Sequence, residues 1–331
     1  MNRPRISVLA TGGTIASAGA SPTATTVYAI ASGVEQLLAA VPAAADLATL
    51  SGEQIANVPS HELTSHDGLR LARRIRALQR SGQCDGVVVT HGTDTIEETA
   101  FLLDRVLPDG FPVVLTGAMR PASAVSADGP LNLINAIRIA ALPQAAGRGV
   151  LVTLNERIGA ARHVAKRHTT AVDAFDGGEA GWAGAIRGER VTFFAPPAVP
   201  AGPRFDLGTI EALADVVVLH GHQDMPAWMF DAAIERGVRG IVFAATGNGS
   251  MPGPVRAAAA RCRARGVLVV RASRTGGGAV TPRPDDAEQG LIPAGGLNPQ
   301  KARILLALAL TRTDEPDAVR DLFAAVDAQP S

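Results

Sequence analysis

The sequence predicts an α/β fold with two α/β domains: a larger N-terminal domain built on a mainly parallel sheet flanked by helices, and a smaller C-terminal one. Short apolar, β-branched runs bounded by glycine, proline and threonine alternate with helical patterns, which is typical of βαβ units. A stretch rich in proline and glycine, residues 195–203, interrupts this alternation. With 331 residues and 47% hydrophobic content, the chain can bury a core in each domain.

Strands are expected at the apolar runs, with helices between them. In the N-terminal part the expected strands are Ile6–Ala10, Gly86–Thr90, Pro112–Thr116 and Gly149–Leu154. In the C-terminal part they are Val216–Leu219, Gly240–Ala244 and Val267–Ala272.

Two of the expected helices have recognisable ends. The segment 95–107 carries an apolar stripe at helical spacing, and Glu97 and Glu98 lie in its first turn, where the helix dipole favours acidic residues. Further along, Asn298 followed by a proline is typical of the N-cap and first position of a helix, which we expect to continue through Leu310.

The proline- and glycine-rich stretch marks the expected domain boundary. We expect an N-terminal domain over residues 1–195, a linker over 196–214 and a C-terminal domain over 215–331.

Charge and cysteine content exclude several classes of function. Basic and acidic residues both number 31, so no global charge attracts nucleic acid or an anionic membrane, and a small polar substrate fits better. No apolar run approaches the length of a membrane span and no signal segment is visible, so we expect a cytoplasmic protein. Cys84 and Cys262 show neither CxxC nor Cys/His ligand spacing, so no disulfide framework, metal site or cofactor is expected.

Lysine and tyrosine are rare in this chain. Only two of the 31 basic residues are lysines, Lys166 and Lys301, and Tyr28 is the single tyrosine. An amine can lose its proton and a guanidinium cannot, so a lysine can be retained for chemistry in an arginine-biased chain. It can also survive by chance on the surface, which is our expectation for Lys301.

The first motif that could carry chemistry is Thr11-Gly12-Gly13-Thr14-Ile15-Ala16, directly after the first expected strand. Ligands of open α/β sheets bind beyond the carboxyl ends of strands, where glycines such as Gly13 let the backbone approach a substrate. Thr14 could attack a carbonyl there, or the segment could be a tight turn whose hydroxyls cap the next stretch of backbone. No Gly-Lys-Ser/Thr completes a phosphate-binding loop.

The second motif, Thr90-His91-Gly92-Thr93-Asp94-Thr95, also comes after a hydrophobic strand. Thr93 and Asp94 stand at the helix entrance, where either could simply be a cap. Two such motifs at strand ends favour a common crevice. His91 has no metal-ligand pattern around it, and neither has His61, so we expect His91 to be a structural hydrogen-bonding residue.

A third candidate segment runs from Asn155-Glu156-Arg157 to Lys166-Arg167. A buried Lys166 with a lowered pKa could accept a proton from a threonine, whereas on the surface it would be one solvated charge beside Arg167.

Together these segments resemble the bacterial type II L-asparaginases and glutaminase-asparaginases. The resemblance runs in order over nearly the whole chain, through LATGGTIAS (9–17), GVVVTHGTDTIEETAFLLD (86–104), VVLTGAMRPASAVSADGPLNLINAI (113–137), TGNGSMP (246–252) and GLNPQKARILLALAL (296–310). The combination of TGGTIA with HGTDT is very specific. It implies a metal-independent amidohydrolase that converts L-asparagine to L-aspartate and ammonia.

The resemblance also implies roles for individual residues. Thr14 would be the nucleophile, assisted by Tyr28 from a mobile loop, while Thr93, Lys166 and Asp94 match a second triad that polarises the threonine or its water. Asp94 would in addition pair with the α-amino group of the substrate.

Ser60 matches a serine that holds the substrate's α-carboxylate. The family pattern further implies a homotetramer, a dimer of close dimers, in which each active site is completed by a neighbour's C-terminal domain.

Three positions depart from the family pattern. His61 stands where glutamine or glutamate is usual, Arg283 where the partner subunit supplies a glutamate, and Ser250 where some relatives carry asparagine. These changes affect amino-group recognition and side-chain selectivity. Because Ser250 is shorter than asparagine and leaves more room in the pocket, we expect moderate glutamine activity beside the main asparagine activity. The alternatives are a non-catalytic amino-acid-binding protein on the same fold, and a related amidase with another amide substrate.

Overall fold

The computed structural model describes residues 3–197 and 202–328, and the chain forms two compact units, Met1–Val199 and Pro200–Ser331. Of the segment that we expected to link two domains, residues 198–201 lie outside the described residues. Each unit is an α/β structure with its own sheet and core, which confirms the predicted fold class.

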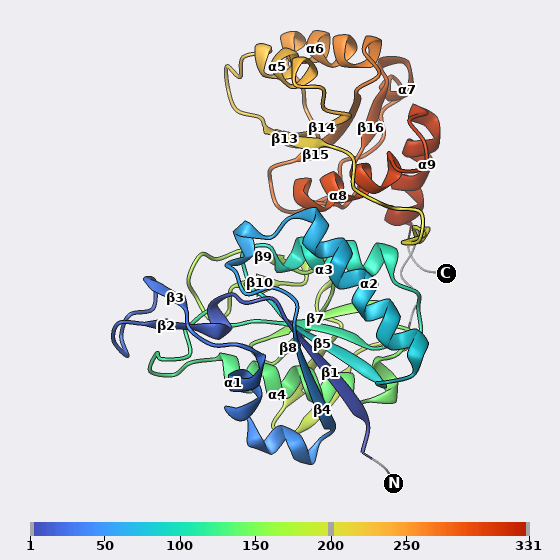
Figure 1. The fold of residues 1–331 in the computed structure, drawn as a ribbon. Coiled ribbons are helices and arrows are strands. Elements are labelled where there is room, and N and C mark those ends of the chain that lie inside the picture. The colour runs from blue at the N-terminus through green and yellow to red at the C-terminus, as the bar shows by residue number, and fades with distance from the viewer. Residues whose placement is uncertain (1–2, 198–201, 329–331) are drawn as a thin grey trace. The chain divides into compact units, whose positions relative to one another are not determined.

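The N-terminal unit is built on an eight-stranded sheet in the order β12-β11-β8-β7-β6-β5-β1-β4 (Figure 1). Five neighbouring strands are parallel: β1 (Arg5–Ala10), β4 (Thr49–Gln54), β5 (Gly86–Thr90), β6 (Val113–Thr116) and β7 (Val150–Leu154). Three antiparallel strands extend the sheet beyond β7, namely β8 (Arg157–Ala160), β11 (Gly184–Arg187) and β12 (Arg190–Phe193).

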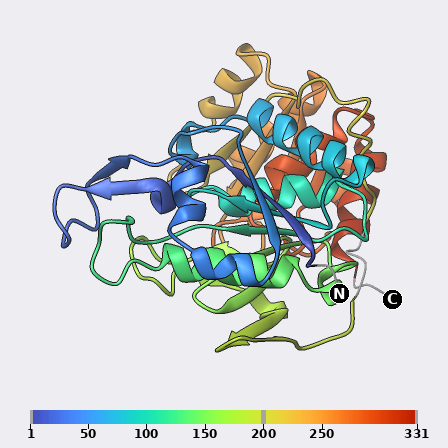
Figure 2. The same cartoon turned by 60° about the horizontal axis from the view of Figure 1, so that its bottom comes forward.

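Helices cover both faces of this sheet. The helices α2 (Ser65–Ser81) and α3 (Ile96–Val106) lie on one face, and α1 (Val34–Ala39) and α4 (Gly129–Ala140) on the other (Figures 1 and 2). Short 3₁₀ helices complete the connections: η1 (Thr14–Ala16), η2 (Pro42–Asp46), η3 (Ser60–Glu62), η4 (Pro143–Ala145) and η5 (Gly178–Ala180).

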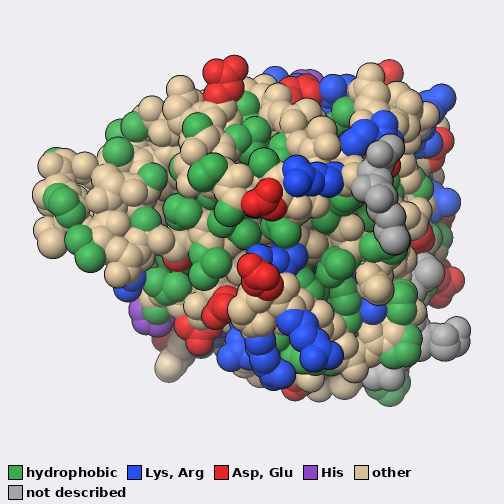
Figure 3. Space-filling view, turned by 90° about the horizontal axis from the view of Figure 1, so that it is seen from below, with side chains coloured by type: hydrophobic (Ala, Val, Ile, Leu, Met, Phe, Trp, Pro, Cys, Tyr) green, Lys and Arg blue, Asp and Glu red, His purple; other side chains and the backbone are tan. Residues whose placement is uncertain are grey.

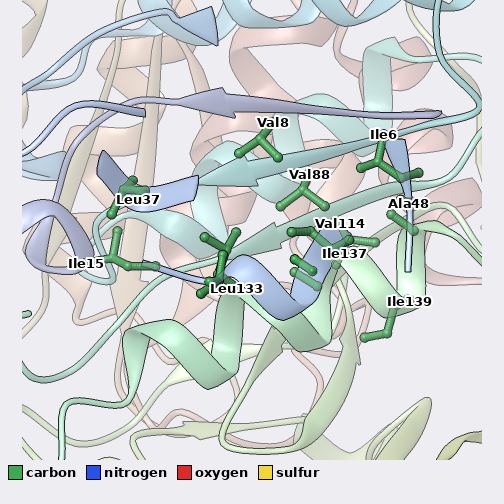
Figure 4. Packing of buried hydrophobic residues seen from close by; sticks show 14 of the residues in the cluster. Ile6, Val8, Ile15, Leu37, Ala48, Val88, Val114, Leu133, Ile137 and Ile139 are labelled. Carbon is green, nitrogen blue, oxygen red and sulfur yellow. The ribbon is translucent and has the colours of Figure 1, made fainter. Parts of the chain in front are cut away.

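A core of buried aliphatic side chains fills the space under α1 and α4. Figure 4 shows Val8, Val88 and Val114 of three neighbouring strands facing Leu133 and Ile137 of α4. These side chains are at most 1% exposed. Because parallel strands buried on both faces need apolar residues at every position, their sequences are continuous apolar runs, which is why they could be predicted.

Two small antiparallel ribbons stand outside the main sheet. One pairs β2 (Ser17–Gly19) with β3 (Tyr28–Ile30), and the other pairs β9 (Ala165–Lys166) with β10 (Phe175–Asp176). The β2–β3 ribbon projects from the body of the unit in both ribbon views (Figures 1 and 2). It has no charged residue between positions 17 and 30, and Figure 3 shows the projection as hydrophobic and uncharged surface.

The C-terminal unit has a smaller, fully parallel sheet in the order β13-β14-β15-β16. Its strands are β13 (Val216–His220), β14 (Gly240–Ala245), β15 (Leu268–Ser273) and β16 (Leu291–Pro293). Around them lie the helices α5 (Trp228–Glu235), α6 (Gly253–Ala264), α7 (Asp286–Gln289), α8 (Pro299–Ala309) and α9 (Pro316–Asp327).

The seven strands expected from the sequence are all present, and each end lies within one residue of its predicted position. The helix expected over 95–107 is α3, and the side chain of Asn298 accepts a hydrogen bond from Lys301 N at the start of α8, as an N-cap does.

The expectation that Lys301 lies on the surface is wrong. Its exposed fraction is 1%, because α8 is buried on almost every side: of residues 301–309 only Arg303 is not buried. The rarity of lysine in the sequence carries no information about how deeply a helix is buried.

Candidate active site

The two motifs predicted at strand ends meet at one edge of the N-terminal sheet. Strands β1 and β5 are parallel neighbours with Ala10 opposite Thr90, so the segments after them leave the sheet side by side. Thr11 continues this pairing, since its N–H and its hydroxyl both donate to Thr90 O at 3.0 Å. The two motifs therefore lie next to each other at this edge of the sheet.

Close backbone contacts explain the two glycines of the first motif. Gly12 and Gly13 have φ angles of 100° and 83°, and a Cβ on either would lie within 2.6 Å of backbone atoms of Val58 or Gly92. The N–H of Gly13 donates to Val58 O at 3.2 Å, so this donor is already engaged. Because Gly13 has no side chain, the loop that carries Thr14 packs directly on the second motif.

Thr14 is anchored by its neighbour in the sequence. Thr14 begins η1, and Ile15, which is 3% exposed, belongs to the core and lies close to Leu133 (Figure 4). A Cβ on Gly129 at the start of α4 would lie 2.9 Å from Ile15 Cγ1, so η1 packs tightly on this helix. This packing holds Thr14 in place, 8% exposed, at the carboxyl end of the sheet.

Tyr28 reaches Thr14 from the projecting ribbon. Its hydroxyl lies 3.0 Å from Thr14 Oγ1, within hydrogen-bond distance, and the side chain is 38% exposed. Tyr28 pairs with Gly19 across the β2–β3 ribbon, which brings the phenol back over η1. The structure thus brings together the nucleophile and the tyrosine proposed from the sequence.

A second group of polar side chains gathers around the neighbouring motif, Thr93 and Asp94, with Lys166 from β9. The Lys166 ammonium donates to Thr93 Oγ1 at 2.9 Å and to Asp94 Oδ1 at 2.6 Å. Thr93 is buried, the Lys166 side chain is 15% exposed and that of Asp94 is 61% exposed. Lysine, threonine and aspartate therefore form a connected set with the carboxylate at its open end.

Ser60 and His61 lie beside this set on η3. Ser60 is buried, and its backbone oxygen accepts a hydrogen bond from Thr95 Oγ1 at 2.9 Å. A Cβ on Gly92 would lie 2.7 Å from Ser60 Oγ. The exposed imidazole of His61 has Nδ1 4.0 Å from Asp94 Oδ2, so it stands next to the same carboxylate.

His91 is fully buried behind the site. Burial lowers the pKa of its imidazole to about 4. The hydrogen bond with Gly92 O acts in the other direction and raises this pKa, but its effect is smaller than that of burial. Nδ1 lies 2.7 Å from that carbonyl oxygen, which can only accept, so Nδ1 carries the proton and Nε2 accepts from Thr99 Oγ1 at 2.9 Å. A neutral imidazole bonded at both nitrogens is the structural residue that we expected.

The first half of the third motif is a turn. Asn155 and Glu156 have φ angles of 48° and 59° and join the antiparallel strands β7 and β8, as the two central residues of a hairpin do. Of that motif, only Lys166 belongs to the site. Its contacts with Thr93 span 73 residues of sequence, so no local pattern could have indicated them.

Ser250 and Arg283 belong to the C-terminal unit, whereas the residues described above belong to the N-terminal unit. Arg283 Nη2 donates to Asn248 O at 3.1 Å, so the loops that carry the two residues are in contact. The buried Arg271 ties both loops together, since it bonds Asn248 O at 3.2 Å and Thr281 O at 3.0 Å.

The described residues offer no alternative centre based on a metal or a reactive thiol. No group of three or more His, Cys, Asp and Glu side chains among them could hold a metal ion. Cys84 and Cys262 are free and buried, and burial raises the pKa of both thiols, that of Cys262 to about 11. Within the described ranges 3–197 and 202–328, no helix has the length and apolar character to cross a membrane.

Comparison with known proteins finds matches to both parts of the chain. Residues 5–199 match the family model "Asparaginase, N-terminal" and residues 215–323 match "Glutaminase/Asparaginase C-terminal domain". The chain is 46% identical to L-asparaginase 2 of Bacillus subtilis over 324 residues, which cover 97% of this chain and 86% of the relative. It is 38% identical to the glutaminase-asparaginase of Pseudomonas fluorescens, over 96% of this chain and 89% of that one.

The chain also matches a solved structure over nearly its whole length. The crystal structure of a probable cytoplasmic L-asparaginase from Campylobacter jejuni matches with a TM-score of 0.94 at 41% identity, over 98% of this chain and all of the other. Both family models and relatives that align over nearly the full length lead to one conclusion: the chain belongs to the asparaginase family.

Proposed function

We propose that the protein hydrolyses the side-chain amide of L-asparagine to L-aspartate and ammonia, with Thr14 as the nucleophile. The observation that carries this proposal is the 3.0 Å contact between Thr14 Oγ1 and the Tyr28 hydroxyl, on a loop packed against the Thr93, Asp94 and Lys166 set. A hydroxyl must be relieved of its proton to attack an amide, and each threonine of the site has a proton-transferring partner within reach.

The first half of the reaction forms an ester on Thr14. The bond between Thr14 Oγ1 and the amide carbon forms while the carbon–nitrogen bond breaks. The Thr14 proton passes to the Tyr28 oxygen as the phenol proton passes to the departing nitrogen, so ammonia leaves and Tyr28 is unchanged. The hydrogen bond of 3.0 Å supports this relay, because proton transfer requires heavy atoms at that separation.

The second half of the reaction hydrolyses the ester. A water molecule attacks the acyl carbon, the acid product leaves, and Thr14 regains its proton. Lys166 and Thr93 polarise this water or the acyl group, and Asp94 fixes the amine by accepting a hydrogen bond at 2.6 Å. Aspartate at the open end of the set is also placed to pair with the α-amino group of a substrate.

Substrate recognition is assigned to residues around this centre. Ser60 holds the α-carboxylate beside Gly13, and His61 borders the position of the α-amino group through its proximity to Asp94. Ser250 is shorter than asparagine and leaves more room for the substrate. A difference of that size changes the discrimination between L-asparagine and L-glutamine by about 1–3 kcal/mol. A moderate activity toward L-glutamine is therefore expected, and Ser250→Asn should lower it relative to L-asparagine.

We further propose a homotetramer made of close dimers, in which a neighbour's C-terminal unit completes each site. Arg283 stands where the family places a partner glutamate, so the neighbour contributes a cation or contributes through another segment. Light scattering measures the assembly, and a fully active monomer would contradict it. The proposed location is the cytoplasm, which cell fractionation of the native source tests.

One experiment separates the proposed reaction from its alternatives. Ammonia release is measured with L-asparagine, L-glutamine and other β- and γ-amides as substrates. Release from L-asparagine above all others supports the proposal, and release from a different amide only would mean another amidase. Binding of L-asparagine without ammonia release would assign the chain to the non-catalytic binding proteins.

A further inference from the structure

The lysine of the site is held at both of its ends by one short segment. Its ammonium donates to Thr93 and Asp94, and its backbone N–H donates to Oε2 of Glu97 at 2.8 Å. Glu97 lies in the first turn of α3, three residues after Asp94, and is 5% exposed. Residues 93–97 therefore fix the main chain and the side chain of Lys166 at the same time.

The strand that carries Lys166 needs such an anchor. β9 has two residues and pairs with β10 alone, with Lys166 opposite Phe175. An isolated two-stranded ribbon is marginally stable at best. The carboxylate of Glu97 gives the Lys166 N–H a partner outside the ribbon, and the N-terminal turn of a helix favours a carboxylate at that place.

We infer that Glu97 is a positioning residue, which acts on the reaction through Lys166 without touching the substrate. This inference rests on the catalytic role proposed for Lys166. The lysine side chain has four rotatable bonds, so its amine stays on Thr93 and Asp94 only if the main chain is held at the right distance. A displacement of about 1 Å in a catalytic group can cost about 100-fold in rate.

Two conservative substitutions separate the effect of the length of the Glu97 side chain from the effect of its charge. Glu97→Gln keeps an oxygen acceptor at the same distance and removes the charge, whereas Glu97→Asp keeps the charge and draws the oxygen back by one methylene. We expect Glu97→Gln to keep kcat within about threefold and Glu97→Asp to lower it about 10- to 100-fold, with the KM for L-asparagine changed by less than about threefold in both.

The controls distinguish positioning from general stability. Glu98→Ala removes the neighbouring carboxylate from the same helical turn and should leave kcat and KM unchanged. Melting temperatures show whether a variant is folded, and the contrast between Gln and Asp remains measurable even if Glu97→Ala does not fold. A structural role alone would lower the activity of both variants in step with their melting temperatures.

The outcomes also separate this inference from the proposed function. No ammonia release from the wild-type protein would refute the proposed function, and full activity of Lys166→Ala would refute the role of the lysine. With wild type active and Lys166→Ala impaired, an unimpaired Glu97→Asp would overturn the inference. A Glu97→Gln variant as impaired as Glu97→Asp would overturn it equally, because charge would then matter more than reach.

Discussion

The hydroxyl oxygens of Thr14 and Tyr28 lie 3.0 Å apart, although Thr14 is followed directly by the core residue Ile15 whereas Tyr28 stands on a ribbon that projects from the body of the unit. The position of Thr14 is therefore fixed by core packing, while that of Tyr28 depends on a small, uncharged ribbon. Removing the Tyr28 hydroxyl should thus impair chemistry more than folding.

Tyr28→Phe is expected to lower kcat by about 100- to 10,000-fold, the usual contribution of one group to acid–base catalysis. The melting temperature should stay unchanged, because the lost hydrogen bond is part-exposed. Steady-state ammonia release with L-asparagine measures the effect. A kcat equal to that of the wild type would exclude Tyr28 from proton transfer.

Thr14→Ala is expected to reduce kcat by at least about 1,000-fold while the protein stays folded, because Ile15 and the glycine contacts hold the loop without the hydroxyl. Thr14→Ser retains the hydroxyl and should keep part of the activity. Incubation with a chelator should have no effect. Undiminished activity of Thr14→Ala would refute the assignment of the nucleophile.

Lys166→Arg should be nearly as damaging as Lys166→Ala, although arginine preserves the positive charge. The amine forms bonds of 2.9 Å and 2.6 Å to Thr93 and Asp94, and a guanidinium is larger and cannot give up its proton. The two variants are compared by kcat at one pH. Near-normal activity of the arginine variant would mean that only the positive charge of Lys166 contributes to the reaction.

His61 should contribute to substrate binding. Its Nδ1 lies 4.0 Å from Oδ2 of Asp94, the carboxylate proposed to pair with the substrate's α-amino group. We expect His61→Ala to raise the KM for L-asparagine by about threefold or more with kcat little changed. His66→Ala, at an exposed position, is the matched control and should leave both constants unchanged. An unchanged KM in His61→Ala would show that His61 does not contact the substrate.

Burial of His91 should make the protein less stable in acid. Its pKa is about 4 when folded and 6.5 when exposed, so between these values the unfolded chain binds a proton that the folded one does not. Stability is therefore complete above pH 6.5 and falls as the pH approaches 4, by about 3 kcal/mol in total for this group.

Urea unfolding at several pH values tests this dependence. His91→Gln has no imidazole to titrate and should show a shallower loss of unfolding free energy toward acid, whereas His66→Gln should keep the slope of the wild type. An unchanged slope in His91→Gln would mean that other groups cause the acid sensitivity.

Local sequence was enough to predict seven of the strands, the helix α3 and the places of Thr14 and Thr93. The strands β1, β5, β6 and β7 are buried on both faces, so each is a continuous apolar run that can be recognised without its neighbours. The edge strand β4 (TLSGEQ) is largely exposed and polar, and no such pattern marks it. Thr14 and Thr93 come directly after recognisable strands, so their place at the sheet edge could be predicted as well.

Only the tertiary structure decided which of these groups meet. The bond from Lys166 to Glu97 joins residues 69 positions apart, and the contact between Gly13 and Gly92 depends on the parallel pairing of β1 with β5. The same holds for Lys301, whose burial follows from the packing around α8 on almost every side. Hydrophobic periodicity records whether a segment is buried, but the choice of partner depends on the packing of the whole domain, which no short pattern contains.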